Sequence, residues 1–321
     1  MTDIRSAIST DRKIYAWELW HPEVTRPCRS DRHRECFMAE PSLRQRWLGN
    51  RLEALRREVG LSLKDASRAA QRSTASLSRI ENGLVALPAR DVGPLLDAYE
   101  IQDESVREAL TTVAKDVEEE RRGWWVEHAA SLSASYLDLV RLESTAQSIR
   151  TYETSLIPGL LQHPFYARQI MAVTSSTELS PDQLDHLVSV RAHRQRILHR
   201  DEEPVALHAI VHEAGLLQDL QAPKVLKQQL EYLCELAELP TITLQVLPLA
   251  ATHPALTGAF TVVSTGQLDW VHVELLTSDV YLETPDSVRP YQSGFEVMSQ
   301  RALTPEESRD LLGERIALLQ N

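Results

Sequence analysis

The sequence predicts two units of different fold class: an all-α unit near the amino terminus, then an α+β unit with a largely antiparallel sheet. Apolar residues between residues 41 and 101 recur at three- and four-residue spacing, as on helices, whereas several later segments alternate apolar and polar residues, as on strands. The charge also reverses between the two units. Residues 41–90 hold ten Lys and Arg against four Asp and Glu, and residues 91–321 hold seventeen against thirty-five.

Two short helices joined by a tight turn form the centre of the all-α unit. Ser62 and Ser73 are each placed to cap the first turn of a helix, and Gly83 is placed to end the second helix in a left-handed conformation. Further amphipathic helices are expected over residues 42–59 and 88–99. The expected inward positions are Leu63, Ala66, Ala69 and Ala70 on the first short helix, and Leu77 and Ile80 on the second.

The second short helix carries outward residues that suit the major groove of DNA, being small or hydrogen-bonding, with one guanidinium. We expect Thr74 and Arg79 to face base edges, and Gln71, Asn82 and the N–H groups at helix starts to hold phosphates. The excess positive charge lies in this unit, as phosphate neutralisation requires. The candidate DNA-binding residues are Gln71, Arg72, Ser73, Thr74, Ala75, Ser78, Arg79 and Asn82.

The segments RLEALRREVGLSLKDA and STASLSRIENG resemble the Xre family, the Cro and repressor type of helix-turn-helix protein. Ala66-Ser67 departs from the Leu-Ala usual in that family. The resemblance implies an all-α, lambda-repressor-like DNA-binding domain at residues 41–101 and a structural ion pair between Arg56 and Glu81. Because one reading helix contacts few base pairs, we expect a homodimer on a double-stranded DNA operator, held together by the acidic unit.

Residues 1–40 lack sustained periodicity, and we expect a poorly ordered extension there. The resemblance to the Xre family implies Met38 as the start of the protein, with the residues before it as an upstream extension. Cys28, His33 and Cys36 form a single trio without a CxxC, so we expect no metal site, and the odd number of cysteines implies no disulfide framework. The sequence contains no apolar run of about eighteen residues, and a cytoplasmic protein is expected.

The acidic remainder, residues 110–321, mixes helical and strand-like segments, which predicts an α+β regulatory or interaction domain. A charged helix runs from about residue 103 through residues 118–122. Expected strands are residues 149–153, 205–211, 241–247, 260–263, 270–274 and 280–283, and expected helices are residues 133–143, 164–173, 181–200, 224–239, 286–300 and 305–319.

Four of the sequence blocks in this remainder are IPGLLQHPFYAR at residues 157–168, RAHRQRIL at residues 191–198, VHEAGL at residues 211–216 and QVLPLAATHPALTGAF at residues 245–260. In this order, such blocks resemble the uncharacterised carboxy-terminal domain of WhiJ-like actinobacterial regulators. The resemblance implies transcriptional control and small BldB-like partner proteins. His212 stands where that family often carries Asp, immediately before Glu213.

Catalysis is not expected. His208 and His212 on one strand are about 13 Å apart by strand rise, so they cannot form an HExxH-type zinc site, and GxSxG, P-loop and GxGxxG motifs are absent. Aromatic residues such as Phe165 and Trp270 fit either a core or a small-molecule pocket, and the core is favoured. The sequence therefore predicts a DNA-binding transcription regulator, a repressor without cofactors. The alternatives are a metabolite-sensing regulator and a DNA-targeted enzyme.

Overall fold

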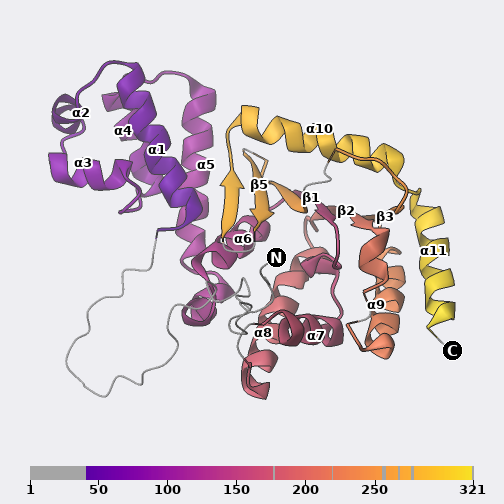
Figure 1. Cartoon of the computed structure of the whole chain (residues 1–321). Coiled ribbons are helices and arrows are strands. Elements are labelled where there is room, and N and C mark those ends of the chain that lie inside the picture. Colours follow the sequence, from indigo (N-terminus) through magenta and orange to yellow (C-terminus); the bar gives the residue numbers. More distant parts are fainter. Residues whose placement is uncertain are drawn as a thin grey trace, which may run out of the picture.

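A computed structural model describes residues 41–175, 178–218, 220–254, 258–266, 268–275 and 278–319. A helical unit packs beside an α+β unit, and α5 runs between the two (Figure 1). The expected amino-terminal extension, with Cys28, His33, Cys36 and Met38, lies outside the described residues. Among the helices of the described residues, none combines the length and apolar character that crossing a bilayer requires.

The helical unit consists of short capped helices around one core. Ser42, Ser62 and Ser73 each accept a hydrogen bond from a backbone N–H in the first turn of the helix that follows, which satisfies a group that would otherwise lack a partner. The helices are α1 (Leu43–Glu58), α2 (Leu63–Ala69), α3 (Thr74–Glu81), α4 (Ala89–Ala98) and α5 (Glu104–Glu120).

The core of this unit continues beyond residue 101. Leu110, Val113 and Ala114 of α5 belong to the same buried cluster as Leu95 and Leu96 of α4. Their spacing of three and four residues places them on one stripe of α5, and that stripe packs on α4. One face of α5, the charged helix expected after residue 103, therefore belongs to the core of the helical unit.

The expected inward position of Ala69 is wrong. Ala69 is exposed, whereas Ser67 is only 5% exposed. The buried stripe of α2 includes Ala66 and Ser67, and it follows the spacing i, i+3, i+4, i+7 from Leu63, which excludes Ala69. A hydroxyl rather than a methyl group therefore faces the neighbouring helix.

The second unit is built on a mixed six-stranded sheet with the order β3-β2-β1-β4-β5-β6. Three of its five pairings are antiparallel, so the expected α+β fold with a largely antiparallel sheet is confirmed. The two parallel pairings, β1 with β2 and β2 with β3, arise because helical crossovers connect those strands. The strands are β1 (Ser148–Glu153), β2 (Ala206–His212), β3 (Ile242–Leu247), β4 (Phe260–Ser264), β5 (Asp269–Glu274) and β6 (Asp279–Leu282).

Helices cover both faces of the sheet (Figure 1). On one face, Phe295 and Met298 of α10 (Pro285–Arg301) pack on Tyr152 and Ile210. On the other face, α6 (Ala134–Ser144), α7 (Pro164–Thr174) and α9 (Pro223–Leu236) share a core with β1, β2 and β3. The remaining elements are α8 (Pro181–Gln195), α11 (Pro305–Leu318) and the 3-10 helices η1 (Trp124–Ser131), η2 (Gly159–Leu161), η3 (Arg196–His199) and η4 (Glu213–Leu216).

Candidate DNA-binding surface and its support

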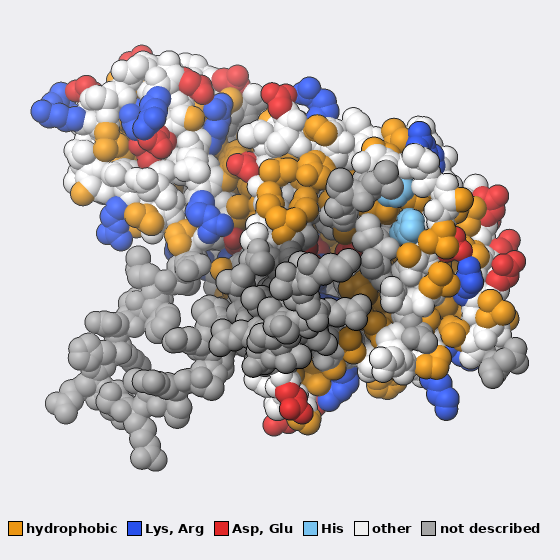
Figure 2. All heavy atoms as spheres, in the orientation of Figure 1, with side chains coloured by type: hydrophobic (Ala, Val, Ile, Leu, Met, Phe, Trp, Pro, Cys, Tyr) orange, Lys and Arg blue, Asp and Glu red, His pale blue; other side chains and the backbone are white. Residues whose placement is uncertain are grey.

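Helix α3 presents its predicted outward residues to solvent. Leu77 and Ile80 are buried in the core, and this orientation leaves Thr74, Ala75 and Arg79 exposed. Basic side chains are spread over the visible face of the helical unit among acidic ones and do not form one dense patch (Figure 2). Arg79 therefore stands out as the long cationic side chain of the helix itself.

The turn between α2 and α3 is held by hydrogen bonds from both sides. Ser67 Oγ lies 3.1 Å from Thr74 Oγ1 and links the two helices. Arg72 donates a hydrogen bond of 2.8 Å to Asp91 of α4 and is therefore engaged within the protein. Gln71 has φ of 53°, a left-handed conformation that glycine adopts at much lower cost.

The carboxyl end of α3 is capped by its own residues. The Asn82 side chain is exposed and donates a hydrogen bond of 2.7 Å to the carbonyl oxygen of Ser78. Ser73, at the opposite end, accepts a hydrogen bond of 3.1 Å from the N–H of Ser76. Both caps keep the short helix intact before it meets any ligand.

A buried ion pair ties α1 to the end of α3. Arg56 donates hydrogen bonds of 2.7 and 2.8 Å to the two carboxylate oxygens of Glu81, and both residues are almost fully buried. Tyr99 donates a third hydrogen bond, of 2.5 Å, to the same carboxylate. Burial raises the pKa of Tyr99, and its hydrogen bond to Glu81 raises it further. Glu81 is therefore fully paired in a site without water access.

The first turns of α1 also pack directly on the end of α3. A side chain at Gly49 would place its Cβ 2.5 Å from the carbonyl oxygen of Ile80, so the two helices approach as closely as their backbones allow. Gln45 donates a hydrogen bond of 2.6 Å to the carbonyl oxygen of Gly83, where φ is 67°. The orientation of α3 is thus determined by the residues of α1 from Gln45 to Arg56.

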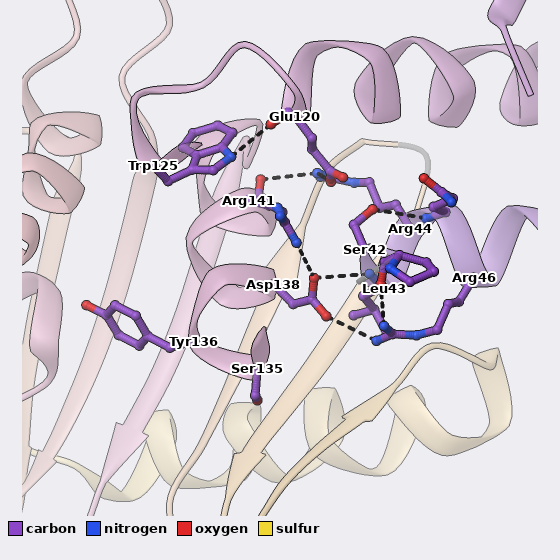
Figure 3. A network of polar contacts seen from close by, with 12 residues as sticks. Ser42, Leu43, Arg44, Arg46, Glu120, Trp125, Ser135, Tyr136, Asp138 and Arg141 are labelled. Atoms are coloured by element: carbon purple, nitrogen blue, oxygen red, sulfur yellow. Dashed lines mark hydrogen bonds and ion pairs between the residues drawn. The ribbon is translucent and has the colours of Figure 1, made fainter. Parts of the chain in front are cut away.

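The same turns of α1 are joined to the second unit through Arg44, which is 1% exposed. Its guanidinium donates hydrogen bonds to Glu120 of α5 at 2.8 Å and to the carbonyl oxygen of Arg141 at 3.1 Å (Figure 3). It also donates a hydrogen bond to Thr145 Oγ1. Asp116 lies 3.6 Å from Arg44 Nε. One buried arginine therefore connects α1, α5 and the end of α6.

Asp138 of α6 makes the second connection. Its carboxylate accepts hydrogen bonds from the backbone N–H of Leu43 at 3.1 Å, from Arg46 at 3.1 Å, and from Arg141 at 3.0 Å (Figure 3). A carboxylate at the amino terminus of α1 also interacts favourably with the helix dipole. Burial nevertheless raises the pKa of Asp138, while the Leu43 N–H acts in the opposite direction. Trp47 adds an edge-to-face contact with Trp270 of β5, with ring centroids 6.2 Å apart.

A second polar cluster lies inside the α+β unit and joins its sequence blocks. Arg194 donates hydrogen bonds of 2.5 and 2.7 Å to Glu143, which is 1% exposed. Arg191 donates to Gln162, and Gln162 donates to the carbonyl oxygen of Ile157 at 2.7 Å. The blocks at residues 157–168 and 191–198 thus hold each other in place. Ile157, Leu160, Leu161 and Tyr166 are core residues, and Phe165 is exposed.

Two histidines of the sheet are engaged in contacts within the protein. His208 Nε2 lies 2.7 Å from Gln245 Oε1, and Asp279 contacts both His272, at 3.0 Å, and Ser135. Because Ser135 and His272 meet the same carboxylate rather than each other, these two residues are not arranged as nucleophile and base. Within the described residues, no group of three or more His, Cys, Asp or Glu side chains is arranged to hold a metal ion.

Comparison with known families identifies both units. Residues 47–110 match a family described as a helix-turn-helix domain, which makes the protein a DNA-binding regulator by class. Residues 136–314 match the family described as Domain of unknown function (DUF5753). This match covers more than half of the chain, so the protein belongs to the DUF5753 family. Searches of curated proteins and of solved structures found no match.

The residues that join the two units have no motif in the sequence that predicts their role. Leu43, Arg44 and Arg46 precede the helix-turn-helix match, and Asp116 and Glu120 follow it. The burial of a single arginine or aspartate leaves no periodic pattern in the sequence, and Arg44 looks like an ordinary basic residue of a helix. One feature does indicate that Arg44 faces inward: it lies one helical turn before Leu48 and so falls on nearly the same face.

Proposed function

We propose that this protein is a sequence-specific, Xre-type transcriptional regulator of the WhiJ-like kind that binds its operator as a homodimer. The observation that carries the proposal is helix α3, which is capped at both ends, buried on one side through Leu77 and Ile80, and exposed on the other through Thr74, Ala75 and Arg79. Such a helix enters the major groove with its exposed side chains against base edges. A nucleoid-associated, cytoplasmic location goes with this role.

Repression is the proposed outcome of operator binding. A regulator represses in this way where its operator overlaps the promoter, because the bound protein and polymerase then compete for the same DNA. The α+β unit is acidic, and the phosphate backbone repels it, so we assign it to self-association and to binding a small BldB-like protein. Its exposed apolar side chains include Phe165, Val173 and Leu217.

The test of the proposed function is selection of DNA from a random library by the full chain, followed by measurement of affinity and stoichiometry on the selected sequence. We expect an enriched motif with two related half-sites and two chains per duplex. Recovery of unenriched DNA, or one chain per site, contradicts the proposal. Adding the small protein encoded next to this chain and measuring operator occupancy tests the assigned partner.

A metabolite-sensing role is the second candidate, and one surface feature favours it. A shallow hollow of about 530 Å³ lies between the loop after β3 and helix α10, and its volume falls within the range of small-molecule sites. His253, which is 6% exposed, and Arg301 line it together with apolar residues. A compound that raises the melting temperature and changes operator affinity together would favour this candidate. Turnover of a substrate would instead support a DNA-targeted enzyme.

A further inference from the structure

The reading helix and the α+β unit are joined by a very short path. Helix α3 ends against Gln45 and Gly49 of α1, and the α+β unit holds Leu43 and Arg44 in the preceding turn of the same helix. A single helical turn rises only about 5.4 Å, so no flexible segment separates the two sets of contacts. The direction of α3 is therefore set relative to α6 by α1 itself.

Three independent contacts oppose rotation between the units. Arg44 bonds to the carbonyl oxygen of Arg141 and to Thr145 at the carboxyl end of α6, and Asp138 holds the first N–H of α1. Trp47 meets Trp270, which is fully buried, and Leu268 packs against both hydrophobic cores. Contacts at three separate points define an orientation, whereas a single contact would act as a pivot.

Orientation matters because a dimeric reader measures the distance between two half-sites. Duplex DNA turns once in about 10.5 base pairs, so moving one half-site by five base pairs presents it on the opposite side of the helix. A dimer whose DNA-binding helices have a fixed orientation binds half-sites at one spacing, whereas a dimer whose DNA-binding units rotate binds them at several spacings. The contacts between the two units of this protein favour a fixed orientation.

We propose that Arg44 and Asp138 are positioning residues that set the half-site spacing recognised by the dimer, although neither side chain reads a base. This inference rests on the proposed function, because it requires a dimer bound to paired half-sites. Arg44 is the stronger of the two, since its guanidinium bonds to α5 and α6 at once. A lysine has no planar fork and cannot make these bonds together.

The experiment uses the full chain and a series of duplexes that carry the selected half-sites with zero to ten added base pairs. We expect the parent to bind its best spacing about tenfold more tightly than the half-turn offset, a difference of about 1.4 kcal/mol. For Arg44→Met and Arg44→Lys we expect a loss of this preference to about threefold or less, with the preferred half-site sequence unchanged. Arg122→Met removes an exposed arginine between α5 and η1 and should keep the parent's profile.

Asp138→Asn is the milder variant, because asparagine has nearly the same side-chain volume as aspartate. This variant allows the test to be made even if the Arg44 variants fail to fold. Thermal melts identify a folding defect, and a merely structural role lowers the melting temperature without flattening the spacing profile. If the folded variants keep the parent's profile, the inference is overturned while the proposed function stands. A parent that binds no paired half-sites overturns both.

Discussion

Arg56 and Glu81 form a two-point ion pair, with both carboxylate oxygens bonded to one guanidinium at 2.7 and 2.8 Å. The side chains are 7% and 3% exposed, so water screens neither charge. The hydroxyl of Tyr99 completes the coordination of the carboxylate, and Arg56 also donates a hydrogen bond to the carbonyl oxygen of Leu61. Together with Tyr99, the pair therefore fixes the relative positions of three elements of the helical unit: α1, the end of α3 and the end of α4.

Removing one member of this pair should be severely destabilising. We expect Glu81→Ala to lower the free energy of unfolding by roughly 3–5 kcal/mol, because the Arg56 charge is left buried without its partner. The double variant with Arg56→Ala should lose much less than the sum of the single losses. Urea unfolding of the parent, both single variants and the double variant measures this coupling. Strictly additive losses would contradict a direct interaction.

Tyr99→Phe isolates the third contact of the same carboxylate. The phenylalanine keeps the buried ring and removes only the hydroxyl, so the loss should be roughly 1.5–3 kcal/mol, as for a hydrogen bond to a charged group. In the Glu81→Ala background the same change should cost much less. An equal cost in both backgrounds would show that the contribution of the hydroxyl does not depend on Glu81.

Gln71 offers a stabilising change. Its left-handed φ of 53° costs a non-glycine residue roughly 1–2 kcal/mol, whereas glycine adopts it freely but loses more backbone entropy on folding. We therefore expect Gln71→Gly to raise the free energy of unfolding by about 0.5–1 kcal/mol. Gln300→Gly makes the same change within helix α10 and should lower it by about 1 kcal/mol. A loss of stability in both variants would refute the strain at Gln71.

The local features of the reading unit could be predicted from sequence, because capping and helical periodicity act over a few residues. Ser62 and Ser73 cap α2 and α3 by accepting backbone N–H groups, and Leu77 and Ile80 face the core. The α+β class of the second unit followed in the same way from alternating apolar residues. The error at Ala69 arose because small residues carry little information on which side of a short helix is buried.

The contacts between distant segments could not be predicted. Arg44 and Thr145 are 101 residues apart, and Leu43 and Asp138 are 95 apart, so no spacing rule relates them. The polar cluster around Glu143 and Arg194 has the same character, since its members lie on separate helices. Pairing of this kind depends on how the sheet and its crossovers bring the helices together.

Glu153, at the carboxyl end of β1, should make stability depend on pH. Burial raises its pKa to about 8 from an ordinary value of 4.5, and Glu274 adds to the rise by charge repulsion. Between these two values the folded chain holds a proton that the unfolded chain releases, so this contribution to stability falls as the pH rises. Glu153→Gln cannot ionise and removes the contribution.

Melting temperatures from pH 5 to pH 9 test this expectation. The advantage of Glu153→Gln over the parent should grow as the pH rises through that range, whereas Glu314→Gln, at an exposed position of α11, should follow the parent throughout. If Glu153→Gln and Glu314→Gln show the same pH dependence, Glu153 titrates like an ordinary surface carboxylate and the expectation is wrong.

Arg79 should determine which base is preferred at one position of each half-site. The effect of removing Arg79 should differ from the general loss of affinity that follows removal of any positive charge. The side chain is exposed on α3, and a guanidinium that donates two hydrogen bonds to guanine contributes roughly 1–3 kcal/mol of discrimination. We expect Arg79→Ala to weaken binding to the selected operator by that amount and to accept any base at one position of each half-site.

Arg68→Ala, which removes an exposed arginine of α2, should weaken binding to all sequences alike and reduce the slope of log affinity against log salt by about 1. Fluorescence anisotropy at several salt concentrations, on the operator and its single-base variants, separates the two behaviours. If Arg79→Ala keeps the full base preference of the parent, then Arg79 does not read the operator.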